Sequence, residues 1–122
     1  MTAFWIRIGS FVMLVGVALG AFGAHGLKNV LSDPMKVVFE TAVRYQFIHG
    51  LALFIVAWLS TQSNSVLISA AGYAFLTGIL VFSGSLYILS LSGIKAWGAV
   101  TPLGGLAFLA GWCLIGLWAI RA

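Results

Sequence analysis

The side chains with the greatest capacity for chemistry lie close together in the sequence, between positions 39 and 50. They are Glu40, Thr41, Arg44, Tyr45, Gln46 and His49. In a helix, Lys36, Glu40 and Arg44 follow at steps of four and share one face, and Glu40 precedes Arg44 in the order that favours an ion pair. The pattern predicts the polar start of a helix, with the remaining polar groups one to two turns deeper.

His25 joins this group if the segment before it forms a neighbouring helix. Two histidines, a carboxylate and a guanidinium have the chemistry to bind an anionic headgroup, hold a metal ion or move a proton. A metal site is disfavoured, because His25 and His49 lack metal-ligand spacing and Glu40 already has Arg44 as a partner. No nucleophile–base motif is visible either, so we expect neither an enzyme nor a cofactor.

Two interpretations of the polar cluster stay open. In the first, which we favour, its hydrogen bonds join the first two helices, because polar groups near lipid need partners. The protein is then a non-enzymatic structural, accessory or partner-binding protein. In the second, the costly ionisable groups mark a functional site, and the protein is a small transporter or a lipid- or amphiphile-binding protein that uses the cluster at the membrane interface.

The composition sets the surroundings of these residues. Of the 122 residues, 62% are hydrophobic and 7% are charged, whereas a soluble domain carries about 25% charged residues. Such a chain cannot cover itself with a water-soluble surface, so the lipid bilayer is its expected partner. Its six Lys and Arg residues are scattered singly, which argues against a nucleic-acid surface.

Charges and turn signals divide the chain into four spans. Residues 8–27 and 45–94 contain no Lys, Arg, Asp or Glu, and the longer run is broken by six polar residues at 60–65. Asp33 and Pro34 form a helix-start signal. We therefore predict an all-α membrane protein, a bundle of four transmembrane helices with short loops in a single domain covering residues 1–122. The expected helices cover about 4–25, 34–60, 65–91 and 96–120.

Several residues near the predicted helix ends lead to further expectations. Four tryptophans should lie in the headgroup layer: Trp5, Trp58, Trp97 and Trp118. Pro102 should kink the last helix. Lys28, Lys36 and Lys95 lie on the side of the first and third loops, against Arg7 and Arg121 on the side of the termini, which favours cytoplasmic loops.

Four glycines form a stripe along the first predicted helix: Gly9, Gly16, Gly20 and Gly23. Small residues on one face let another helix approach closely, which drives association in lipid. We expect the stripe to pack within the bundle, because four helices with short loops must first satisfy one another. A seam between copies of the chain, in a homo-oligomer, is the alternative, and a protein partner is not identified.

Three motifs carry a family resemblance. They are GAFGAHGL at residues 20–27, FETAVRYQ at 39–46 and HGLAL at 49–53. They resemble the domain of unknown function 423 family, which comprises small YgdD-like and YwdK-like bacterial inner-membrane proteins with relatives called transmembrane protein 256. The resemblance implies a multi-pass protein of the bacterial inner (plasma) membrane and supplies no reaction. It places the family's motif on the seven residues of the polar cluster.

Overall fold

The computed structural model describes all 122 residues, and almost all of them are helical. Four helical segments are long and apolar enough to cross a membrane. The first two are α1, Thr2–His25, and α2, Asp33–Gln62. The third combines α3, Val66–Gly78, a π-helical turn, Ile79–Ser83, and α4, Gly84–Ser92; the fourth combines a 3-10 turn, Lys95–Ala99, and α5, Thr101–Arg121. The predicted all-α bundle of four transmembrane helices is confirmed.

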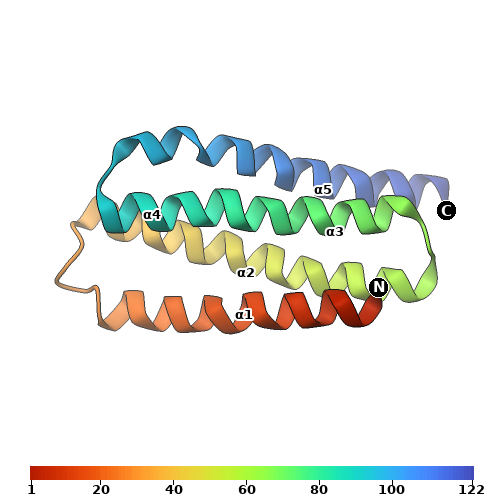
Figure 1. Ribbon diagram of the computed structural model, residues 1–122, viewed down its shortest axis with the longest axis horizontal. Coiled ribbons are helices and arrows are strands. Elements are labelled where there is room, and N and C mark those ends of the chain that lie inside the picture. Colours follow the sequence, from red (N-terminus) through yellow and green to blue (C-terminus); the bar gives the residue numbers. More distant parts are fainter.

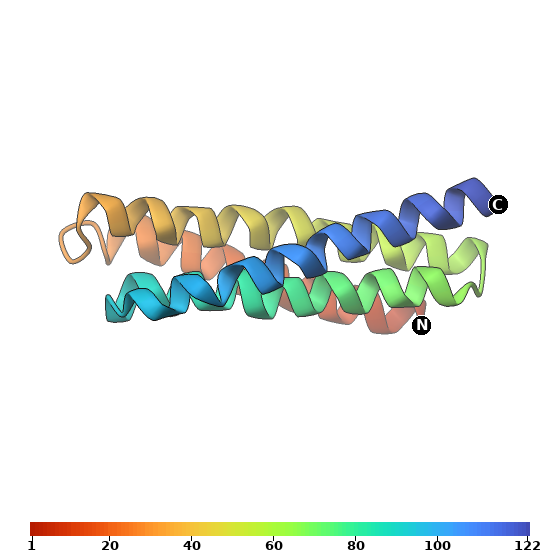
Figure 2. The ribbon, with the colours of Figure 1, turned by 90° about the horizontal axis from the view of Figure 1, so that it is seen from above.

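The bundle places α2 beside the α3–α4 segment at its centre, with α1 and α5 on the two flanks (Figures 1 and 2). The main contacts of α1 are with α2, and those of α5 are with α3 and the π-helical turn. Both termini lie at the same end as the α2–α3 turn, and the α1–α2 loop lies at the other end (Figure 1). As a result, α2 is the most buried of the four spans.

The start of α2 follows from its local sequence. The Ser32 hydroxyl accepts a hydrogen bond from the backbone N–H of Met35 at 3.4 Å, and Pro34 lies in the first turn. A serine cap satisfies a backbone group that the helix leaves free, and proline loses no helical bond at that place. Together they fix where α2 leaves the loop, which sets the height of every polar residue after it.

The glycine stripe of α1 packs against side chains of α2. A Cβ atom placed on Gly23 would lie 2.5 Å from the Phe39 ring, and one on Gly16 would lie 2.8 Å from Phe47. Gly9 faces Phe54 and Gly20 faces Val43 in the same way. The stripe therefore packs against α2 within the chain, as expected.

Two residues near the ends of the spans, Trp5 and Pro102, show how those ends are built. Trp5 lies near the start of α1 and is 0% exposed, with its ring against Gly72, where a Cβ would lie 2.5 Å away. The space left by this glycine accepts the indole inside the bundle. The last span is interrupted at Val100, between the 3-10 turn and α5 and close to where Pro102 predicts a kink. Pro102 itself stands in the first turn of α5, where its missing N–H removes no helical hydrogen bond.

Candidate functional site

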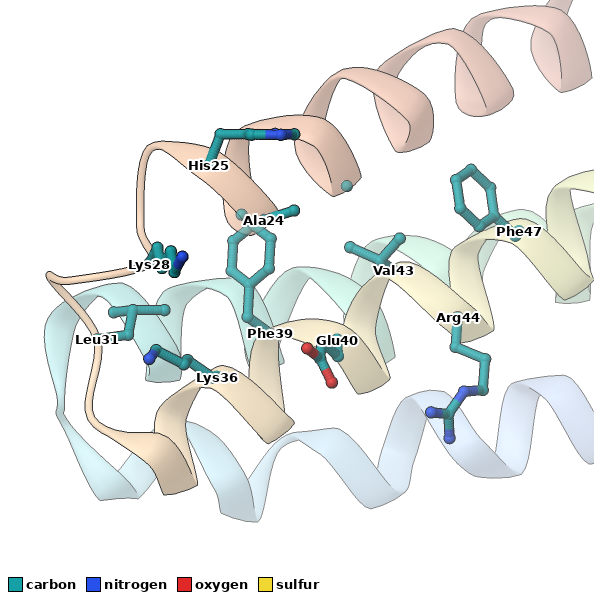
Figure 3. A pocket seen from close by; sticks show the side chains of 12 residues that line it. Ala24, His25, Lys28, Leu31, Lys36, Phe39, Glu40, Val43, Arg44 and Phe47 are labelled. Carbon is teal, nitrogen blue, oxygen red and sulfur yellow. The ribbon is translucent and has the colours of Figure 1, made fainter.

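A groove with a volume of about 760 Å³ opens between the end of α1, the loop after it and the start of α2 (Figure 3). Its volume lies within the roughly 300–1,000 Å³ typical of small-molecule sites. We call it the basic groove. It is lined by Gly20, Gly23, Ala24, His25, Lys28, Leu31, Lys36, Phe39, Glu40, Val43, Arg44 and Phe47.

The floor of the basic groove is apolar. Phe39 and Val43 are buried, and Phe47 and Leu31 are half-buried beside them. Gly20 and Gly23 carry no side chains, so the α1 wall adds no polar group to this floor. An acyl chain or another apolar group can lie here without leaving a polar atom unsatisfied.

The rim of the basic groove is rich in positive charge. Lys28, Lys36 and Arg44 line it together with His25, and Glu40 is the one acidic residue among the lining side chains. The Nζ of Lys36 lies 3.5 Å from Oδ1 of Asp33, whose side chain is 97% exposed, and such exposed pairs contribute about 0–1 kcal/mol. The rim therefore keeps a surplus of cationic groups that can engage an anion.

The expected ion pair between Glu40 and Arg44 is absent. The only salt bridge in the structure joins Lys36 and Asp33. Both side chains are exposed and extend separately from α2 (Figure 3). At an exposed site, solvation competes with the Coulomb attraction, and holding two long side chains in one geometry costs entropy. The favourable spacing is therefore not enough to form the pair.

The exposed face of α2 shows where the basic groove lies in the membrane. Glu40 and Arg44 are exposed near its start, and the same face continues with the exposed apolar residues Ile48, Leu51 and Ile55. Since charged groups are costly in hydrocarbon, the change from Arg44 to Ile48 marks the boundary between headgroups and acyl chains. From this boundary we infer that the basic groove lies at the level of the headgroups.

Gln46 lies on the opposite, buried side of α2. Its amide Nε2 donates to the backbone oxygen of Val12 in α1 at 2.9 Å, and its Oε1 accepts from the Tyr87 hydroxyl in α4 at 2.5 Å. One side chain therefore ties three spans together. The tie between α1 and α2 that we expected from the charged residues comes from this amide instead.

His49 also serves the interior of the bundle. The indole Nε1 of Trp112 donates to His49 Nε2 at 3.0 Å, and His49 Nδ1 lies 2.9 Å from the backbone oxygen of Tyr45. Because an indole nitrogen can only donate, Nε2 accepts and Nδ1 carries the hydrogen that is donated to Tyr45. The ring also stacks on Phe108, with 3.5 Å between the ring centroids. Both nitrogens of His49 are therefore occupied.

The structure thus divides the seven predicted cluster residues. His25, Glu40 and Arg44 line the basic groove, although His25 Nδ1 also lies 3.0 Å from the backbone oxygen of Ala21. Gln46 and His49 are buried in the bundle, where Tyr45 packs on Phe82 and Phe108. Thr41 donates to the backbone oxygen of Val37 within α2.

Sequence reasoning missed part of each set. Lys28 belongs to the rim and was not predicted, whereas Lys36, which the sequence placed on one face with Glu40 and Arg44, was left outside the cluster. Tyr87 and Trp112 come from apolar runs that carry no sign of their hydrogen bonds to α2. No group of three or more His, Cys, Asp and Glu side chains is arranged to hold a metal ion.

Comparison with known proteins gives consistent matches. The family described as "Protein of unknown function (DUF423)" matches residues 19–105. A UPF0382 membrane protein of Staphylococcus haemolyticus is 46% identical over 111 residues, covering 91% of this chain and 90% of the relative. The UPF0382 membrane protein YwdK of Bacillus subtilis is 43% identical over 118 residues, covering 96% of each. No solved structure matches.

Proposed function

The chain belongs to the DUF423 family of multi-pass bacterial membrane proteins, whose function is unknown, and on this basis we propose that its basic groove binds the headgroup of an anionic membrane lipid. The observation that carries the proposal is the charge of the rim, where three Lys and Arg side chains and His25 face one Glu. Basic pockets between transmembrane helices are a recurrent type of site for phosphate-bearing headgroups.

The arrangement of the basic groove matches an amphiphile. Cationic side chains stand at the headgroup level, and Phe39, Val43 and Phe47 form an apolar floor beside them. Lysine and arginine donate charge-assisted hydrogen bonds to phosphate oxygens. A lipid that enters sideways from the bilayer can place its phosphate on the rim and part of a chain on the floor.

The different hydrogen bonding of the buried and exposed polar residues of α2 also supports binding. Gln46 and His49 make the hydrogen bonds that join the spans, whereas Arg44 and Glu40 make none. Charged residues at membrane depth are costly, so groups that hold nothing together are available for a ligand.

The proposed role is binding and not catalysis. The basic groove offers no nucleophile paired with a base, and both nitrogens of His49 are engaged elsewhere. An accessory role, in which the protein holds or senses anionic lipid, follows from this arrangement.

The test is a lipid titration of the full chain in mild detergent, followed by native mass spectrometry and thermal melting. Phosphatidylglycerol should bind and raise the melting temperature, whereas phosphatidylcholine should do neither. Lys28→Gln and Lys36→Gln should each weaken phosphatidylglycerol binding about fivefold, since one basic group near an anionic membrane surface contributes about 1 kcal/mol.

Lys95→Gln is the matched control, because Lys95 is exposed at the same end of the bundle and does not line the basic groove. Its affinity for phosphatidylglycerol should equal that of the unchanged protein. Equal binding of the two lipids, or an equal loss in the Lys95 variant, would show that the basic groove is not the site.

A further inference from the structure

The Lys and Arg side chains of the basic groove stand at two levels. Lys28 and Lys36 lie at the loop end with His25, whereas Arg44 stands apart, deeper along α2, and its side chain extends away from α1 (Figure 3). Lys36 and Arg44 are eight residues apart on one helix, so their Cα atoms are separated by about 12 Å at roughly 1.5 Å per residue. A single phosphate held among the outer cations leaves Arg44 without a partner.

Glu40 stands between these two levels. It is four residues from Lys36 and four from Arg44, or about 6 Å along the helix from each. It forms no salt bridge with either of them. An ionised carboxylate can only accept hydrogen bonds, and it repels a nearby phosphate. A ligand with phosphates on both sides of Glu40 therefore needs a hydrogen-bond donor that faces this carboxylate.

We propose that the lipid bound in the basic groove carries two phosphates joined by a short linker with a hydroxyl group. One phosphate lies among Lys28, Lys36 and His25, the second lies on Arg44, and the linker hydroxyl donates to Glu40. This inference rests on the proposed function and specifies its ligand.

The side-chain types suit these positions. The planar guanidinium of arginine can donate to two phosphate oxygens at once. This bidentate contact suits Arg44, which is the only cation near the hydrocarbon boundary and must hold the second phosphate alone. The outer level uses lysines, which act as flexible point charges. The apolar floor formed by Phe39, Val43 and Phe47 receives part of an acyl chain next to the second phosphate.

The experiment compares cardiolipin, which has two phosphates joined by a glycerol, with phosphatidylglycerol at equal phosphate concentration. Native mass spectrometry of the full chain in detergent counts the lipids bound and gives their affinities. We expect one cardiolipin per chain, bound about tenfold more tightly than phosphatidylglycerol. Arg44→Gln should abolish this preference, whereas Lys36→Gln should weaken both lipids by a similar factor and Lys95→Gln should change neither.

Arg44→Lys is a second variant that keeps the charge and removes the fork, and it should retain only part of the preference. Melting of each variant in lipid-free detergent shows that it is folded. Three results would overturn the two-phosphate inference and leave the proposed function standing. They are equal affinity for the two lipids per phosphate, binding of two phosphatidylglycerol molecules per chain, and an equal loss of affinity for both lipids in Arg44→Gln. If neither lipid binds, the proposed function itself fails.

The hydroxyl is tested with a cardiolipin analogue that lacks it. The unchanged protein should bind this analogue at least about fivefold more weakly than cardiolipin, since a hydrogen bond to a charged group is at stake. In Glu40→Ala the difference between the two lipids should disappear, as a coupling between the two groups requires. A difference of the same size in both proteins would show that Glu40 does not accept from the linker.

Discussion

Arg44 and Gln46 stand two residues apart on α2, and their surroundings differ completely. Gln46 is 4% exposed, and both its amide nitrogen and its amide oxygen are hydrogen-bonded to other spans. Arg44 is exposed and forms no salt bridge. The same short motif therefore supplies a buried face that holds the bundle together and an exposed face that lines the basic groove.

The comparison shows how a polar motif in a membrane helix can be interpreted. A polar residue whose partners lie within the chain serves the structure, because a buried polar group without a partner is costly. A charged residue at membrane depth without such a partner is a candidate for a functional site. Substitutions on one face at a time therefore separate effects on stability from effects on lipid binding.

The largest effect on stability is expected for Gln46→Leu. This change removes the bond to the Val12 carbonyl and leaves the Tyr87 hydroxyl without its acceptor. Interhelical bonds in membrane proteins contribute up to about 1.7 kcal/mol each, so the loss should be about 2 kcal/mol. Unfolding in a series of denaturing detergent mixtures measures it, and a change below half that value would place the tie between the spans elsewhere.

A smaller loss, about 1 kcal/mol, is expected for His49→Phe. The new ring keeps the stacking on Phe108 but cannot accept from the Trp112 indole, so one interhelical hydrogen bond is lost. The same unfolding assay measures the change, and tryptophan fluorescence should shift as the indole nitrogen loses its partner. If His49→Phe lowers the free energy of unfolding as much as Gln46→Leu does, His49 contributes more to stability than its contacts indicate.

The smallest effects are expected on the exposed face. Glu40→Gln and Arg44→Gln should each change stability in lipid-free detergent by less than about 0.5 kcal/mol, as is usual for surface positions. A loss of 1 kcal/mol or more in either variant would restore the structural role that the sequence suggested for this pair. Lipid binding should change in the Arg44 variant nonetheless, which is the contrast that separates the two faces.

Much of the fold was predictable because its signals are local. Gaps between charges located the four spans, and the start of α2 followed from Pro34 and its neighbours. The division of the polar cluster was not predictable to the same degree, because it depends on Tyr87 and Trp112, which are more than 40 residues away from Gln46 and 60 from His49, respectively. Helical spacing also favoured the Glu40–Arg44 pair without accounting for solvation at an exposed site.

The α1–α2 hairpin contains every residue that lines the basic groove, from Gly20 to Phe47. Chains are synthesised from the N-terminus, so the whole lining has been made before the third span leaves the ribosome. Tyr87 is made later, and its hydroxyl then closes on Gln46 from the far side of α2. During biogenesis, therefore, the half of the protein that lines the basic groove can meet lipid while the segment that carries Tyr87 is still being translated.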